Sequence, residues 1–441
     1  MKRLLSLLLC AVLALFCATT AQAAGVSITL TASEYALHYA FDAGAQDPFV
    51  ILEYATPAEK GWMMLYSEDG HFEGDVSLAY SGAGGKTSVA LTSARTTGSI
   101  GKASTTLPKA ADYQKPTGKS NAKVMDFVLT ETPEGFHYAF NAAGTDYMLL
   151  YWRSKEQTVT QPVYPDENGH YEGDVISDLT FARTQFTVQV KSGSGSMKKE
   201  ATVRKGYQAP EAPQRQEGRL SGVTVCIDAG HQENGRFVNE PIGPGLSGST
   251  SGKGGMAQGT KTNRRESIVC LEIGMLLRDE LLRQGANVVM TREDQTTFHT
   301  NIERCEIAEA GGAQIMLRLH CNNSSNRSKR GIQVYGPLNS DYAKAVADAD
   351  TYREMGQKLL DAMKTRVGMT LANSTGMVRL NDNYVGNNWA KMMCFLVEMG
   401  YLSNPAEEYL LVTPVYQQWL AEGMADGVYE IAVARGWVQA Q

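Results

Sequence analysis

The sequence is poor in three features that would each indicate a class of protein. It has seven cysteines and no Cys-x-x-Cys pair, and the odd number of five after residue 220 argues against a fully paired disulfide framework. Its formal net charge is -6, which argues against nucleic acid as the main partner. After residue 16 no apolar run approaches the roughly 20 residues that a membrane span requires. The composition therefore predicts neither a disulfide scaffold, nor a nucleic-acid-binding protein, nor a membrane span.

The amino-terminal segment has the pattern of a secretory leader. Lys2 and Arg3 precede the apolar stretch 4–16, and the small residues Ala21 and Ala23 offer a cleavage site. We therefore predict a signal peptide over residues 1–23. Its removal takes away two positive charges and shifts the net charge from -6 to -8. We expect the processed chain to be soluble and to lie outside the cytoplasm.

Residues before position 210 contain a tandem repeat. The tetrapeptide HYAF at 38–41 recurs at 137–140, and GHFEGDV at 70–76 recurs as GHYEGDV at 169–175, with the same spacing of 99 residues. Short alternating runs separated by Asp, Gly and Asn turns predict a small β-sandwich of immunoglobulin or fibronectin character in each copy. We place these repeats at 26–116 and 124–210, joined and followed by polar, proline-bearing linkers.

Each copy also carries a histidine and a glutamate on one strand face. These are His71 with Glu73 in the first copy and His170 with Glu172 in the second. A second metal site is one interpretation. A turn or a packed imidazole, retained in both copies of a duplicated fold, explains the pairs more simply.

The remainder, 220–437, alternates strand and helix patterns. Residues 287–291 read as a strand, Thr300 and Glu303 form a capping box for a helix, and residues 340–366 predict one long helix. Thr413 and Pro414 are typical of a helix start. We expect an α/β domain with a mostly parallel, helix-covered sheet.

Four polar residues occupy the ends of these elements. His231 follows the apolar run 223–227, His320 closes the run 315–319, and Glu398 closes another apolar run. Glu266 opens a long amphipathic helix. The carboxyl ends of parallel strands share one edge of a sheet, where ligands gather, so all four residues are expected to converge there.

The residue types suit metal-assisted hydrolysis. Two imidazoles and one carboxylate form a three-ligand catalytic zinc set with a position open for water. Zinc lowers the pKa of that water to about 7 and polarises a carbonyl. Glu398 would then transfer the proton from water to the leaving amine.

These residues stand in segments that resemble the zinc-dependent N-acetylmuramoyl-L-alanine amidases of bacterial cell-wall turnover. The resemblance spans nearly all of 220–437 and rests on Glu266 and on the motifs IDAGH at 227–231, VVMTRED at 288–294, LRLHCNN at 317–323 and LVEMGYLSNP at 396–405. It implies that His231, Glu266 and His320 are the Zn²⁺ ligands and that Glu398 is the catalytic glutamate.

One segment departs from the family pattern. A long Gly/Ser/Thr-rich stretch, 232–265, separates His231 from Glu266 where the family has a short glycine-rich stretch. Such a segment is either functional or disordered. It is either a mobile rim over the substrate groove or a tolerated surface insertion.

The resemblance implies a secreted, cell-wall-associated enzyme that cleaves the amide between N-acetylmuramic acid and L-alanine in peptidoglycan. A zinc peptidase acting on stem peptides and a non-catalytic wall-binding protein are the alternatives. The mildly acidic chain lacks a basic excess that would hold it on an anionic wall. The repeats are therefore interpreted as a module for a wall polymer or a protein partner, or as a spacer.

Overall fold

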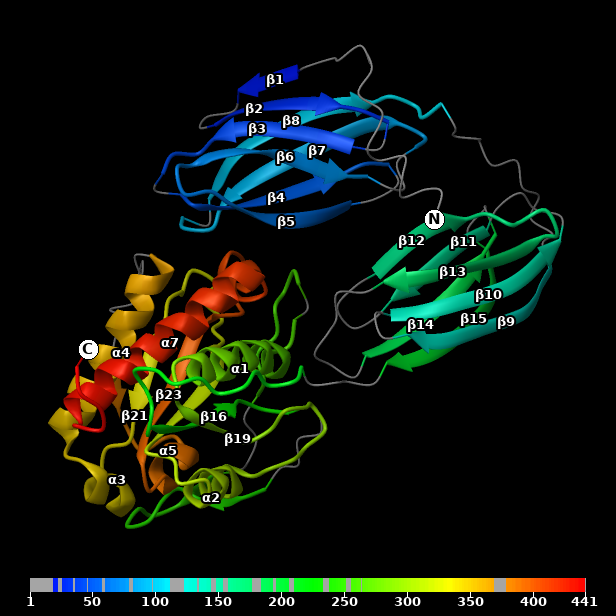
Figure 1. Ribbon diagram of the computed structural model, residues 1–441. Helices are drawn as coiled ribbons and strands as arrows, with labels where there is room; N and C mark the ends of the chain where they lie inside the picture. The colour runs from blue at the N-terminus through cyan, green and yellow to red at the C-terminus, as the bar shows by residue number, and fades with distance from the viewer. Residues whose placement is uncertain are drawn as a thin grey trace.

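The computed structural model shows two β-rich bodies followed by an α/β body (Figure 1). The predicted leader lies almost wholly outside the described residues, as does most of the linker between the repeats, whereas the linker after the second repeat is described from residue 210. The structure describes residues 19–22, 26–34, 36–45, 47–57, 60–78, 82–96, 98–111, 123–132, 135–143, 148–153, 158–176, 184–192, 196–205, 210–232, 238–250, 255–262, 264–368 and 378–440.

The first repeat consists of two antiparallel sheets, and Thr19–Gln22, which fall within the predicted leader, add strand β1 to the edge of one of them. Their strand orders are β1-β2-β3-β6 and β5-β4-β7-β8. Alternate residues of β2, β3 and β8 are buried, and side chains from both sheets form one apolar core. The strands are β1 (Thr19–Gln22), β2 (Ser27–Ala32), β3 (Ala36–Asp42), β4 (Phe49–Ala55), β5 (Lys60–Tyr66), β6 (His71–Ser77), β7 (Gly85–Ser93) and β8 (Ser99–Leu107).

The second repeat reproduces this arrangement with sheets β13-β10-β9 and β12-β11-β14-β15. His137 pairs in register with Asp174 as His38 does with Asp75, so the duplicated motifs occupy equivalent strands. The immunoglobulin or fibronectin character remains a prediction. The strands are β9 (Lys123–Thr132), β10 (Gly135–Ala143), β11 (Met148–Arg153), β12 (Thr158–Val163), β13 (His170–Ile176), β14 (Thr184–Lys191) and β15 (Met197–Lys205).

The α/β body is built on a six-stranded sheet of order β19-β16-β20-β23-β21-β22. Its strands are β16 (Thr224–Ala229), β19 (Asn287–Met290), β20 (Ile315–Asn322), β21 (Gln333–Gly336), β22 (Val378–Leu380) and β23 (Met393–Tyr401). A separate two-stranded pair contains β17 (Glu240–Pro241) and β18 (Ser249–Thr250). Its helices are α1 (Glu266–Arg283), α2 (Asn301–Ala310), α3 (Asp341–Val346), α4 (Ala349–Val367), α5 (Val385–Trp389), α6 (Glu407–Leu411) and α7 (Pro414–Ala434).

The main sheet is mixed, which corrects the expectation of a mostly parallel sheet in one respect. Strands β19, β16, β20 and β23 are mutually parallel, whereas β21 runs antiparallel to β23. Only residues 323–332 join β20 to β21, without a helix. A parallel return requires a crossover of a dozen or more residues, so this short connection sends β21 back in the opposite direction.

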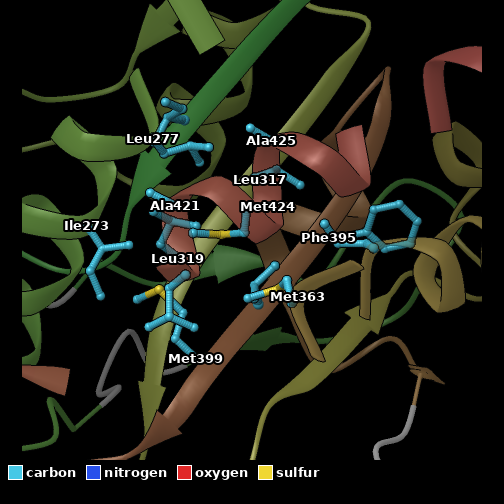
Figure 2. Close-up of a cluster of buried hydrophobic side chains, with 14 of the residues drawn as sticks. Ile273, Leu277, Leu317, Leu319, Met363, Phe395, Met399, Ala421, Met424 and Ala425 are labelled. Carbon is cyan, nitrogen blue, oxygen red and sulfur yellow. The ribbon is translucent and has the colours of Figure 1, made fainter. Parts of the chain in front are cut away.

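Helices cover both faces of the sheet. α1, α4 and α7 contribute to the larger core, and Figure 2 shows side chains of α1, α7, β20 and β23 meeting there. α2 and α5 cover the other face in a smaller cluster that includes Cys226, Cys305 and Cys394. All five cysteines after residue 220 are buried free thiols. Among the described residues, no helix is both long and apolar enough to cross a membrane.

The predicted helix starts in the α/β body are confirmed, but one predicted helix is divided in two. Thr300 and Glu303 form the predicted capping box, and α7 begins at Pro414. The single helix expected over 340–366 is divided into α3 and α4, because Ala347 adopts an extended conformation. The Asp348 side chain accepts a hydrogen bond from the backbone N–H of Thr351 (2.8 Å) and so caps a new helix.

Candidate functional site

His231, Glu266 and His320 meet at the edge of the sheet where β16 ends, with His320 near the carboxyl end of β20. Glu266 lies between the two imidazoles. Its Oε1 is 2.9 Å from His320 Nδ1 and its Oε2 is 3.1 Å from His231 Nε2. The three donor atoms lie within 4.8 Å of one another, and the two rings are nearly perpendicular. The convergence expected for these three residues is therefore present in the structure.

Backbone donors hold the Glu266 carboxylate in this orientation. The N–H of Cys321 donates to Oε1 (3.0 Å), and the N–H of Ala257 donates to Oε2 (2.7 Å). Burial alone would raise the pKa of Glu266, but hydrogen bonds from His231 and His320 hold that pKa well below its usual range. Glu266 is therefore ionised. Burial lowers the pKa of His320, which favours its neutral, ligating form.

His231 adopts a left-handed backbone conformation, with φ of 57°. This region costs free energy for residues with a Cβ and requires support from the surroundings. Arg304 supplies some of it, because its guanidinium donates to the carbonyl oxygens of Ala229 (3.0 Å) and His231 (3.2 Å). Arg292 donates to the carbonyl oxygens of Ala229 (2.7 Å) and Gly230 (2.8 Å). These two arginines fix the turn that carries His231.

Gly230 permits the close approach of this turn to β20. Its N–H donates to the carbonyl oxygen of Leu319 (2.9 Å). A Cβ at this position would lie 2.4 Å from the same oxygen and 2.6 Å from the His320 ring. Any larger residue would therefore displace β20 or the His320 imidazole.

Asp228 binds two arginines, Arg304 of α2 and Arg318 of β20. It is fully buried. Its carboxylate accepts hydrogen bonds from the Arg304 guanidinium, from Arg318 Nε (2.9 Å) and from the Thr291 hydroxyl (2.8 Å). Burial alone would raise the pKa of Asp228, but the Arg304 and Arg318 charges hold it far below its usual range. Arg304 thus forms a structural ion pair with Asp228, and Arg292 donates to backbone carbonyl oxygens.

Glu398 lies beside His320 in the register of β20 and β23. It is within β23 instead of at its end, because the strand continues to Tyr401. Its Oε2 is closed to solvent and has no hydrogen-bond partner among the described residues. Burial, and then the nearby Glu266 charge, raise the pKa of Glu398 well above its usual value. The carboxyl can therefore hold a proton at a pH where an exposed glutamate has lost it.

All four residues line one cavity of about 740 Å³. Asn322, Asn323, Asn383 and Tyr384 also line it. Asn383 and Tyr384 were not singled out from the sequence, since they lie in a polar turn before α5 that carries no motif signal. Asn322 and Asn323 lie two and three positions after His320, at the end of the motif LRLHCNN.

The described parts of the 232–265 stretch form a wall of this cavity and are anchored. Val238, Thr250 and Met256 line the cavity. Glu240 accepts hydrogen bonds from the backbone N–H groups of Asn301 (3.2 Å) and Ile302 (2.8 Å) at the start of α2. Glu240 thus ties this segment to the start of α2 beside the cavity.

The repeat histidines face carboxylates in a matching way. His71 Nε2 is 3.7 Å from Glu73, and His170 Nε2 is 3.7 Å from Glu172. His38 and His137 contact the same two glutamates, at 3.3 Å and 3.2 Å. Within the described part of the chain, however, only His231, Glu266 and His320 are spaced to hold a metal ion. Glu73 and Glu172 thus each contact two histidines of their own repeat.

Comparison with known proteins identifies the α/β body. Residues 225–430 match the N-acetylmuramoyl-L-alanine amidase family. The germination-specific N-acetylmuramoyl-L-alanine amidase of Bacillus subtilis is 26% identical over 231 residues, which cover 49% of this chain and 83% of that protein. The probable cell wall amidase LytH of Staphylococcus aureus is 27% identical over 218 residues, covering 48% of this chain and 60% of LytH.

A solved structure is also similar to this part of the chain. The apo N-acetylmuramyl-L-alanine amidase Ami1 of Mycobacterium abscessus is 19% identical, with a TM-score of 0.44, and the match covers 48% of this chain and 99% of that one. The family match and the two curated relatives coincide with the body that holds the candidate site. Residues 225–430 thus match the N-acetylmuramoyl-L-alanine amidase family, in the family model and in both curated relatives.

Proposed function

We propose that this chain is a secreted, zinc-dependent hydrolase that cleaves the amide between N-acetylmuramic acid and L-alanine in peptidoglycan. The family match supports the reaction and the substrate. The observation that carries the metal-assisted mechanism is the arrangement of two histidines and one ionised glutamate around a common point, with a second, unpartnered carboxyl in the same cavity.

The residues present fit a zinc ion. Imidazole nitrogen and carboxylate oxygen are the donors of catalytic zinc sites with three protein ligands. His231, Glu266 and His320 would hold the ion, and the backbone N–H groups of Cys321 and Ala257 would keep the glutamate aligned. When bound, zinc supplies Lewis-acid chemistry, which polarises a carbonyl and activates water at neutral pH.

Glu398 performs the proton transfers in this proposal. Amide hydrolysis requires a base that takes a proton from the attacking water and an acid that gives it to the leaving amine. A carboxyl with a raised pKa can serve in both steps. Arg292, Arg304 and Gly230 position His231 and His320 and take no proton.

The domain organisation is part of the proposal. A leader at 1–23 directs secretion, β-sandwich repeats occupy 26–116 and 124–210, and the amidase domain occupies 220–437. The repeats would contact a cell-wall polymer or a protein partner.

Metal removal and Glu398→Gln together test the reaction class. Dialysis against a chelator should abolish release of fragments from dye-labelled peptidoglycan, and zinc should restore it. The Glu398→Gln variant should bind zinc as the wild type does while turnover falls by about 10²–10⁴-fold, the usual contribution of general acid–base catalysis. Activity that survives chelation, or that survives in this variant, would contradict the assignment.

A further inference from the structure

The first repeat is docked on the α/β body through one side of β4 and β5, which we call the docking face (Figure 1). Ring centroids lie 4.4 Å apart for Trp62 and Tyr409, and 5.2 Å apart for Tyr66 and Trp419. The Tyr409 hydroxyl donates to Glu53 (3.3 Å). The docking face contains Phe49, Ile51, Glu53, Trp62, Met64 and Tyr66, as the β4–β5 register requires.

Burial along β4 shows that this contact belongs to the fold of the chain. The four residues 49–52 are all buried, because Val50 and Leu52 enter the core of the repeat while Phe49 and Ile51 meet the α/β body. In the second repeat the buried residues of β11 alternate with half-buried ones. A continuous apolar run in a sandwich strand is the expected mark of a strand covered on both faces.

The docking face meets α6 and the start of α7, and α6 has a second attachment next to the metal-binding candidates. Glu408, which precedes Tyr409, is fully buried. Its carboxylate accepts hydrogen bonds from the Thr260 hydroxyl (3.0 Å) and from the backbone N–H groups of Lys261 (2.9 Å) and Thr262 (3.3 Å). α6 therefore holds the segment that leads into α1.

That segment in turn orients Glu266. Gln258 and Arg265 form an antiparallel bridge, which places Ala257 beside the first turn of α1. Ala257 and Glu266 exchange two hydrogen bonds: the Ala257 N–H donates to Oε2 (2.7 Å), and the Glu266 N–H donates to the Ala257 carbonyl (2.9 Å). A continuous series of contacts thus runs from Trp62 to the carboxylate between the two histidines.

We infer that the first repeat positions the Glu266 carboxylate for metal binding, through Tyr409 and Glu408 of α6. The inference rests on the proposed role of Glu266 as a ligand. Residues that orient a ligand contribute 10–100-fold to metal affinity in comparable sites. Glu408 is a positioning residue, Trp62 packs on Tyr409 of α6, and Tyr66 packs on Trp419 of α7. The repeat thereby becomes a part of the enzyme, beyond any role as a spacer or wall-binding module.

Two variants of the full chain test this inference. In the first, Trp62→Ser with Tyr66→Ser removes two partly exposed side chains of the docking face and leaves the core of the repeat intact. In the second, Glu408→Gln retains the size of the side chain but weakens its hold on Lys261 and Thr262. The control is Tyr164→Ser, an exposed tyrosine of the second repeat.

The readouts are zinc affinity by competition with a chromogenic chelator, amide hydrogen exchange at 257–262, and the radius of gyration by small-angle scattering. We expect both variants to bind zinc at least about tenfold more weakly and to exchange faster at 257–262. The double variant should also expand, and the control should match the wild type.

Three outcomes would overturn the inference. The double variant could expand and still bind zinc within twofold of the wild type, or remain compact with unchanged affinity. Glu408→Gln could leave zinc affinity and exchange unchanged. If the wild type itself binds no zinc, the proposed function fails instead, so the two failures are distinguishable.

Discussion

Substitution of Asp228 by asparagine should destabilise the α/β body strongly. The change keeps the size of the side chain but removes the one carboxylate that, among the described residues, pairs with both Arg304 and Arg318, which are themselves buried. Removal of one partner from a buried ion pair leaves an uncompensated charge and costs about 3–5 kcal/mol. An asparagine oxygen can still accept one hydrogen bond, so we expect the lower half of that range. The free energy of unfolding of a folded domain is about 5–15 kcal/mol in total, so this loss is large.

Urea unfolding followed by circular dichroism at 222 nm measures this effect. Every helix among the described residues lies between Glu266 and Ala434, so the helical signal reports the α/β body separately from the repeats. With a denaturant slope of about 2 kcal/mol per molar urea, the midpoint should fall by roughly 1.5–2 M. The control is Asp361→Asn at an exposed site on α4, which should change stability by less than about 0.5 kcal/mol.

The pKa of Asp228 also predicts how the difference in stability between the wild type and Asp228→Asn depends on pH. Because the folded pKa of Asp228 lies far below its unfolded value, its contribution is complete above the unfolded pKa and is lost progressively as the pH falls from there through the folded pKa. The wild type and Asp228→Asn should therefore differ by a constant free energy between pH 6 and 8. A midpoint within about 0.3 M of the wild type would refute the view that Asp228 holds the two arginines beneath the site.

Three further substitutions follow from the site and its surroundings. His320→Ala should lose both zinc, by chelator competition, and activity; zinc binding equal to the wild type would contradict its assignment as a ligand. Gly230→Ala should cost about 1–3 kcal/mol of stability and weaken zinc binding, because its Cβ would meet the Leu319 carbonyl and the His320 ring; unchanged thermal unfolding and zinc affinity would oppose this reasoning. Burial raises the pKa of Glu407 to about 7, whereas its pKa in the unfolded chain is about 4.5. Between these two values the folded state binds more protons than the unfolded state, so the contribution of Glu407 to the free energy of unfolding falls as the pH rises. Glu407→Gln should reduce that slope in urea titrations across this range, and an identical slope would count against a raised pKa.

Much of the site was predictable because its residues sit at points that sequence patterns identify. His231, His320 and Glu398 interrupt or end apolar strands, and Glu266 opens a helix with a clear apolar face. Parallel β16 and β20 then bring two of these residues together. Their chemical types were sufficient to suggest zinc.

The contacts that hold the site residues in place were harder to predict from the sequence. Arg304 contacts Asp228 across 76 positions, and no periodicity indicates which arginine an aspartate in a strand will meet. An aspartate inside the otherwise apolar β16 was the available signal, since a buried charge requires a partner. The antiparallel direction of β21 depends on the short connection that precedes it. The break before α4 depends on one capping side chain, that of Asp348.

The docking of the first repeat on the α/β body was also not predicted, although one apolar run in the sequence indicates it. The run FVIL at 49–52 does not alternate, as a strand with one solvent-exposed face would. An interpretation of that run as a doubly covered strand would have predicted a neighbour for β4. It would not have identified α6 and α7, because the contact joins residues more than 350 positions apart.

The most direct test of the central claim is the identity of the bond that is cut. The chain without its first 23 residues would be incubated with zinc and purified peptidoglycan, and the newly released amino termini would be labelled and identified by mass spectrometry. The account predicts new amino-terminal alanine, absent with Glu398→Gln. A different new terminus would indicate a stem-peptide peptidase, and no new terminus would indicate a non-catalytic protein; either result would contradict the account.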